Sequence, residues 1–276
     1  MSFRFVQFEF AFPLGPADGR YLRRLDAGGE PERVLVVNTI GAPPRPPRRR
    51  RRPPRLEDGA PATVPAVRVT VIDPHRFETA SDAERWLERL RRDEDARVTE
   101  VALAARELNF LLRAHRAAAI DPYARDVVAD AATVVRVGYG SGEEVADGRF
   151  EAAVEAPPPR RRRRRAEVLA PQERLAATLA GRAPLVPAEE LVLRARADLD
   201  AHRPREAALQ TRIALEALLA HLRADTDVTA LEAHRAAVVD AAGAALDGDL
   251  NDELAAAVEA AVAELERAVR RAARRA

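Results

Sequence analysis

The chain has 276 residues, of which 47% are hydrophobic but only 4% aromatic, so alanine, leucine and valine must supply most of its core. It contains no cysteine, which excludes disulfides, thiolate zinc sites and iron–sulfur clusters. The formal net charge is +1 at pH 7, and every one of the 45 cationic residues is arginine.

The positive charge is concentrated in two short segments. Residues 45–55 contain seven arginines, and residues 160–165 are six consecutive arginines. Without these thirteen charges the formal net charge of +1 becomes −12. The composition is therefore that of an acidic protein carrying two basic segments.

The start of the chain, MSFRFVQFEF, lacks the basic segment and the long apolar run of a secretory signal. No stretch approaches the 18 or so apolar residues that a transmembrane helix needs. We therefore expect a cytoplasmic protein without a membrane span.

The first third of the chain predicts strands. Residues 3–12 alternate, with Val6, Phe8, Phe10 and Phe12 on one face, and a turn rich in proline and glycine follows. Residues 34–40 form a second, more uniformly apolar strand. Residues 41–65 are dominated by proline and arginine, and we expect a disordered loop because they have little apolar surface to bury.

The pattern then mixes helices with strands. A strand at 67–72 is expected to stop at Asp73-Pro74, and Ser81 with Glu84 has the spacing of a capping box for a helix ending near Arg92. A short helix is expected to end near residue 131, and residues 133–139 and 149–154 predict a β-hairpin. A longer helix is predicted over 97–119, because an apolar stripe runs along it. The stripe consists of Val101, Ala105, Leu108 and Leu112.

Residues 156–165, APPPRRRRRR, form the best domain boundary. Everything after them is predicted to be helical, with helices near 187–201, 204–223, 228–242 and 250–274. The expected organisation is an α/β domain over 1–155, a linker over 156–165 and a helical domain over 166–276. The predicted fold class is an α+β N-terminal half, a small sheet with two or three helices, followed by an all-α helical bundle.

The last helix carries an apolar repeat typical of a short coiled coil or a bundle helix. We call four of its residues the interaction seam and expect them to mediate contact with a protein partner or a second copy. The interaction seam consists of Leu254, Val258, Ala261 and Leu265.

Motifs for catalysis or cofactor binding are weak, and we assign no catalytic residue, metal site or cofactor. Gly138, Gly140 and Gly142 follow a strand, as in nucleotide loops, but the next residues are Glu143 and Glu144, which favours a hairpin. The five histidines show no metal-ligand spacing.

An enzyme of another kind remains an alternative, with a site near the strand ends around Asp73, Tyr139 and Ser141. The surroundings of Ser141 resemble a nucleophile elbow, but no helix is expected after it.

The arginine runs are candidates for binding anions, because guanidinium groups on flexible segments attract phosphate backbones. The alternative is a low-complexity segment that is merely solvated. Aromatic residues for base stacking are missing nearby, so any nucleic-acid binding is expected to be non-specific. The candidate residues are Arg48, Arg49, Arg50, Arg51, Arg52, Arg160, Arg161, Arg162, Arg163, Arg164 and Arg165.

Two segments resemble known proteins. Residues 189–219, EELVLRARADLDAHRPREAALQTRIALEALL, look like one tetratricopeptide-type helix pair, without a second copy at a 34-residue period. Residues 121–150, DPYARDVVADAATVVRVGYGSGEEVADGRF, are similar to uncharacterised proteins of high-GC actinobacteria, a resemblance that implies no activity.

Our leading interpretation is a non-enzymatic interaction or scaffold protein that self-associates through its C-terminal helices. The first alternative is an accessory protein that binds nucleic acid non-specifically through the arginine runs. The second is the enzyme described above.

Overall fold

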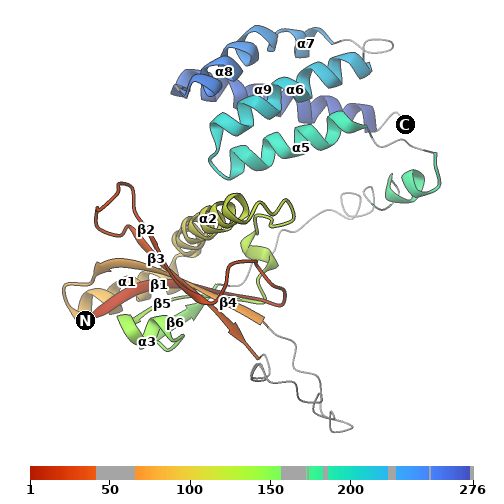
Figure 1. Ribbon diagram of the computed structural model, residues 1–276. Helices are drawn as coiled ribbons and strands as arrows, with labels where there is room; N and C mark the ends of the chain where they lie inside the picture. Colours follow the sequence, from red (N-terminus) through yellow and green to blue (C-terminus); the bar gives the residue numbers. More distant parts are fainter. Residues whose placement is uncertain are drawn as a thin grey trace. The chain divides into compact units, whose positions relative to one another are not determined.

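The structure is a computed structural model that describes residues 1–41, 66–156, 172, 174–182, 186–222, 228–248 and 250–273. The chain divides into two compact units, Met1–Arg160 and Arg161–Ala276 (Figure 1). The first unit combines an antiparallel sheet with helices and the second is helical, which confirms the predicted fold class.

The sheet of the first unit has six strands in the order β2-β3-β4-β1-β5-β6, and each neighbouring pair is antiparallel. The strands are β1 (Ser2–Phe10), β2 (Gly19–Arg23), β3 (Arg33–Ile40), β4 (Ala66–Arg76), β5 (Val134–Ser141) and β6 (Ala152–Glu155).

Strand β1 lies inside the sheet and is buried on both faces. Phe8 pairs with Val69 on β4 and with Val135 on β5, and its side chain has no exposed area. Gln7 points to the opposite face, where its amide donates a hydrogen bond of 3.3 Å to the hydroxyl of Thr70. The polar side chain is therefore paired where it is buried, as the cost of an unpaired buried amide requires.

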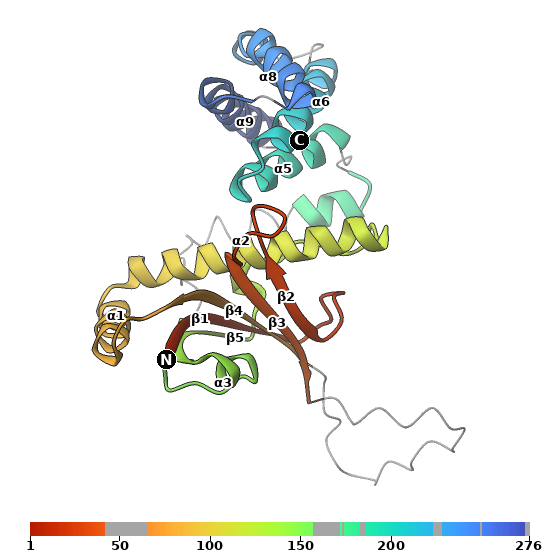
Figure 2. The same cartoon turned by 60° about the vertical axis from the view of Figure 1, so that its left-hand side comes forward.

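Helices cover both faces of the sheet (Figure 2). One face packs against α1 (Ala80–Arg92) and α2 (Glu94–Ala119), and the other packs in part against the short α3 (Gly142–Ala146). Val101, Leu108 and Leu112 of the predicted stripe are buried on α2, whereas Ala105 is only partly buried and Ala104 is fully buried beside it. A 3₁₀-helix, η1 (Ala129–Ala131), stands where a short helix was expected.

Three local predictions were wrong. Residues 19–23, for which no strand was predicted, form strand β2, and β4 continues through Asp73-Pro74 to Arg76. The capping box of α1 is made by Thr79 and Asp82, two residues earlier than the predicted pair. The pairing of β4 with β1 is irregular between Phe3 and Phe5, at the end of β4 that contains Pro74. An irregular pairing tolerates a proline because it does not require a backbone N–H at every position.

The second unit consists of helices α5 (Pro187–Asp200), α6 (Pro204–Leu222), α7 (Thr229–Glu232), α8 (Arg235–Asp247) and α9 (Asp252–Ala273). Residues 174–179 are also helical. Helix α6 packs against α5, α8 and α9, and α5 and α6 form the helix pair expected at 189–219. The helix predicted over 228–242 is divided into α7 and α8.

The helices of the second unit approach closely because small residues line their contacts. One core cluster contains Ala195, Ala207, Ala208, Ala241 and Ala245 together with Val258 and Val262. An ion pair adds to this packing, since the guanidinium of Arg196 on α5 donates to the carboxylate of Glu266 on α9 at 3.0 Å. Glu266 also accepts a hydrogen bond of 3.2 Å from Arg270, one turn further along α9.

Candidate functional site

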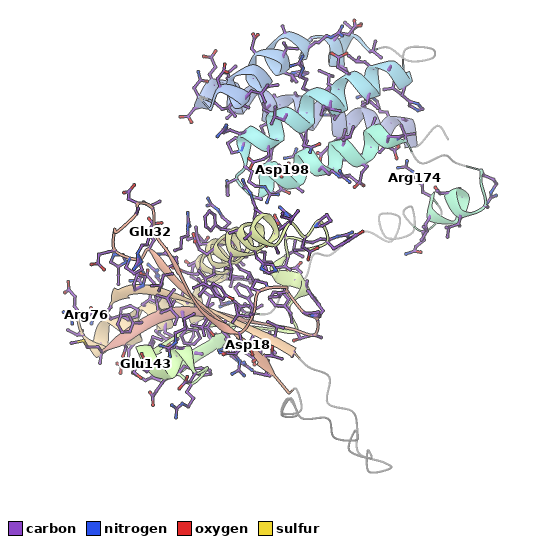
Figure 3. The ribbon with its side chains drawn as sticks, viewed as in Figure 1. Asp18, Glu32, Arg76, Glu143, Arg174 and Asp198 are labelled. Atoms are coloured by element: carbon purple, nitrogen blue, oxygen red, sulfur yellow. The ribbon has the colours of Figure 1, made fainter. Side chains whose placement is uncertain are left out.

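A small cavity lies on the α1–α2 face of the sheet, at the end where β1 begins and β4 finishes (the side chains of this unit are drawn in Figure 3). Its volume is about 50 Å³. By the volume that a bound water needs, this is room for about four water-sized groups. Four charged side chains and the indole of Trp86 line it, above apolar residues that include Val71 and Ala104. The charged residues are Arg4, Arg33, Asp73 and Glu100.

The strand register brings these groups together. Arg4 lies on β1, Asp73 on β4 and Arg33 at the start of β3, so three neighbouring strands each contribute one charge. The carboxylate of Asp73 is 3.7 Å from Nε of Arg4 and 3.8 Å from Nη1 of Arg33. It also accepts a hydrogen bond of 2.9 Å from the backbone N–H of His75. Asp73 is thus held between two cations and is largely buried, with 17% of its side chain exposed.

Aromatic rings hold the guanidinium of Arg4 at the rim of the cavity. Its carbon lies 5.1 Å from the ring centre of Phe77 and 5.8 Å from that of Trp86. Contacts of this length between a guanidinium and an aromatic face are attractive and fix the orientation of the cation.

Two residues that line this cavity each carry a buried N–H group without a hydrogen-bond acceptor in the described part of the protein. These groups are Nε of Arg4 and Nε1 of Trp86. A buried donor without an acceptor costs about 1–3 kcal/mol, so such pairs of donors are rare in folded proteins. Both nitrogen atoms are buried and contribute almost no accessible surface, so they lie behind the wall of the cavity.

The residues of the enzyme alternative do not converge on one site. Asp73 lines the cavity just described, whereas Tyr139 lines a second and larger hollow of about 420 Å³ with Glu84 and Glu88 of α1. Burial raises the pKa of the Tyr139 phenol above its ordinary value. Ser141 lines neither hollow, and its hydroxyl donates to the carboxylate of Glu144 at 2.7 Å.

The glycine cluster belongs to the β5–β6 connection, and the strands pair as the predicted hairpin. The connection holds the five-residue helix α3, which the sequence did not predict after Ser141. Gly138 is required by close approach, because a Cβ there would lie 2.3 Å from the carbonyl oxygen of Ala152. Gly140 is also crowded, since a Cβ on it would lie only 2.9 Å from the side chain of Val145 on α3.

Within the described residues, no group of three or more His, Asp or Glu side chains is placed to hold a metal ion. His75 contacts Asp73 through Nδ1 at 2.9 Å. No helix in the described ranges is long and apolar enough to cross a membrane. The cytoplasmic localisation stays a prediction.

The arginine residues predicted to bind anions, Arg48–Arg52 and Arg160–Arg165, lie outside the described residues, as does nearly all of the loop predicted over 41–65. Their role stays a prediction.

The interaction seam of α9 lies in the interior of the second unit. Val258, Ala261 and Leu265 are at most 1% exposed, and Leu254 is partly buried. They pack in the two core clusters that also contain residues of α5, α6 and α8. The seam therefore contacts helices of its own chain, as in the bundle-helix interpretation of the repeat.

Helix α8, in contrast, exposes an apolar stripe. Its buried side consists of Val238, Ala241, Ala242 and Ala245. About a third of the way round the helix lie Ala236, Val239, Gly243 and Leu246 at helical spacing, which we call the α8 stripe, and the exposed Asp240 and Asp247 lie beyond it. Val239 is 39% and Leu246 67% exposed. A Cβ at Gly243 would meet no atom within 4 Å, so the middle of the stripe is open.

Comparison of the chain with protein-family models, with curated proteins and with solved structures gave no match. The tetratricopeptide-type and actinobacterial resemblances stay expectations from the sequence.

Proposed function

We propose that the protein is a non-enzymatic interaction protein that forms a homodimer through the α8 stripe. The observation that carries the proposal is that α8 has an apolar stripe beside its buried side, and only the buried side is covered by described residues. Exposed apolar side chains that line up along one stripe of a helix are suited to a further contact.

The α8 stripe is self-complementary in an antiparallel arrangement. Val239 and Leu246 lie at equal distances from the midpoint between Ala242 and Gly243. A two-fold axis through that midpoint places the valine of each copy against the leucine of the other, as an isologous interface requires. Gly243 at the crossing point allows the two helix backbones to approach closely.

The charges along α8 are compatible with the same arrangement. Arg235 stands at the start of α8 and Asp247 at its end, and both are exposed. With a rise of 1.5 Å per residue, they lie roughly 11 Å and 7 Å from the midpoint on opposite sides. An antiparallel copy therefore brings Asp247 of each copy toward the end of the other α8 that carries Arg235, whose guanidinium already pairs with Glu216 of its own chain.

Sedimentation velocity of the full chain, from low micromolar to several hundred micromolar, tests the proposal. We expect a concentration-dependent shift from the monomer to the dimer mass. Leu246→Glu should abolish the shift, because it places a carboxylate against the apolar stripe of the second copy. Leu193→Glu is the matched control, since Leu193 on α5 is 61% exposed and belongs to the same unit. A monomer mass over the whole range, or equal loss in both variants, would contradict the proposal.

A further inference from the structure

We infer that an extended peptide binds along strand β6, adds a strand to the sheet and places an arginine side chain in the hollow between α1 and β6. This inference concerns the first unit and is independent of the dimer proposed for the second. It is carried by the free edge of β6 and by the carboxylate of Glu84 and the hydroxyl of Tyr139 in the hollow beside that edge.

Strand β6 ends the sheet on one side, and within the described ranges it pairs only with β5. The backbone N–H of Ala156 donates to the carbonyl oxygen of Val135 on β5 at 2.9 Å. Because successive residues of a strand direct their N–H and C=O groups to alternate sides, those of Ala153 and Glu155 point away from β5. Such unpaired backbone groups are what a peptide uses when it is recognised by strand addition.

The hollow lies beside this edge, on the face of the sheet that α1 covers. Tyr139 and Ala152 line it from the sheet, and they pack in one core cluster with Leu87 of α1. In an added antiparallel strand, the residue opposite Ala152 directs its side chain to the same face, with the two Cβ atoms about 4.5–5.5 Å apart. That side chain therefore enters the hollow, whose volume of about 420 Å³ accommodates a long residue.

The charges of the hollow select a cation. Arg85 pairs with Asp82, and Arg91 pairs with Glu88 at 3.4 Å. Glu84 lines the same hollow, is exposed, and has no ion-pair partner among the residues that the structure describes. The two arginines are thus already neutralised, and a carboxylate is left for the ligand.

The hydroxyl of Tyr139 supplies a second acceptor. It makes no hydrogen bond with a described residue, yet it is not among the enclosed polar atoms, so the 8% of Tyr139 that is exposed includes it. A guanidinium carries five N–H donors in a planar fork and can donate to a carboxylate and a phenol oxygen together. Leu87 and Ala152 offer apolar contact to the methylene groups of the same side chain.

The probe is a pentapeptide, Thr-Val-Arg-Val-Thr, with an N-terminal fluorescein and an amidated C-terminus. Its anisotropy should rise saturably with the full chain. The neutral analogue with citrulline in place of arginine should bind about tenfold more weakly, as for a lost hydrogen bond between charged groups. Methylation of the two valine nitrogens, which removes donors to β6, should also weaken binding. In the complex, amide hydrogen exchange of Ala153 and Glu155 should slow, because strand addition gives their N–H groups acceptors.

Two protein variants test the role of Glu84. Glu84→Gln should raise the Kd of the arginine peptide at least fivefold and leave that of the citrulline peptide unchanged, since only the charged pair is lost. Glu30→Gln, at an exposed position between β2 and β3, is the matched control and should change neither. Absence of saturable binding would overturn the inference. So would equal binding of the arginine and citrulline peptides, equal effects of the two variants, or unchanged exchange at Ala153 and Glu155.

Discussion

Arg235 at the start of α8 donates two hydrogen bonds, each of 2.7 Å, to the two carboxylate oxygens of Glu216 on α6. The carboxylate raises the pKa of the guanidinium above its ordinary value, chiefly through these hydrogen bonds. This bidentate pair joins α8 to α6 and is consistent with the packing of Val238 and Ala241 on the buried side of α8. Val239 follows Arg235 by one helical turn, so this pair lies at the N-terminal end of the α8 stripe.

Replacing Gly243 should separate the stability of the fold from the stability of the dimer. Leucine has a higher helix propensity than glycine by about 1 kcal/mol, and the position is open, so Gly243→Leu should raise the free energy of unfolding. The same side chain would force the two α8 helices apart and weaken the dimer about tenfold. Urea denaturation and sedimentation velocity measure the two effects. A higher free energy of unfolding together with an unchanged dimer affinity would contradict the proposed crossing point at Gly243.

Enlarging the interaction seam should affect folding and leave the oligomeric state unchanged. Ala261 is 1% exposed in the core of the second unit, so Ala261→Leu should lower the free energy of unfolding by about 1–3 kcal/mol. Ala260→Leu, at an exposed position of the same helix, is the control and should have little effect. If Ala261→Leu left the free energy of unfolding unchanged but altered the fraction of dimer, the interaction seam would have to lie at a surface.

The β5–β6 pair should depend on the small size of residue 138. Gly138→Ala places a methyl group 2.3 Å from a backbone oxygen and 2.7 Å from Cβ of Ala153, so β6 must move. We expect a loss of about 1–3 kcal/mol in the free energy of unfolding. Gly19→Ala serves as the comparison because its nearest neighbour would be 3.9 Å away. Thermal unfolding of both variants decides the point, and equal midpoints would refute the close approach.

The start of α1 should depend on Thr79 and be sensitive to acid. Thr79→Ala removes the acceptor for the backbone N–H of Asp82, at a cost of about 1 kcal/mol, whereas Ser81→Ala should cost little. The Thr79 hydroxyl lowers the pKa of Asp82 below its ordinary value. A lowered folded-state pKa gives a contribution that is present above the unfolded pKa and is lost as pH falls through the folded one. Asp82→Asn should remove this part of the acid dependence, measured by chemical denaturation between about pH 2 and 6.

The spacing of apolar residues predicted the longer helices and strands, because burial of one face determines which positions are apolar. The alternation of Val6, Phe8 and Phe10 and the spacing of Val101, Leu108 and Leu112 both follow from one face meeting the core. Strand β2 was missed because residues 19–23 carry Arg20 and Arg23, whose charges are neutralised by Glu143 and Glu107 far along the chain. No local pattern encodes such distant partners.

The candidate sites were less predictable than the fold. Asp73 was singled out at a strand end, but the neighbours that define its cavity, Arg4 and Trp86, depend on the strand order and on the position of α1. For the same reason, an apolar repeat could not distinguish the buried seam of α9 from an exposed surface. The α8 stripe was not recognised because alanine and glycine occupy both sides of that helix.

The most direct test of the proposed dimer uses the absence of cysteine from the chain. Gly243→Cys introduces one thiol beside the proposed two-fold axis, where two Cα atoms can come within the roughly 4.4–6.8 Å that a disulfide spans. Under mild oxidation at micromolar concentration, we predict a covalent dimer that is separated by non-reducing electrophoresis and disappears on reduction. Leu193→Cys, on exposed α5, should remain monomeric under the same conditions. Equal cross-linking of the two variants, or none in Gly243→Cys, would contradict dimerisation through the α8 stripe.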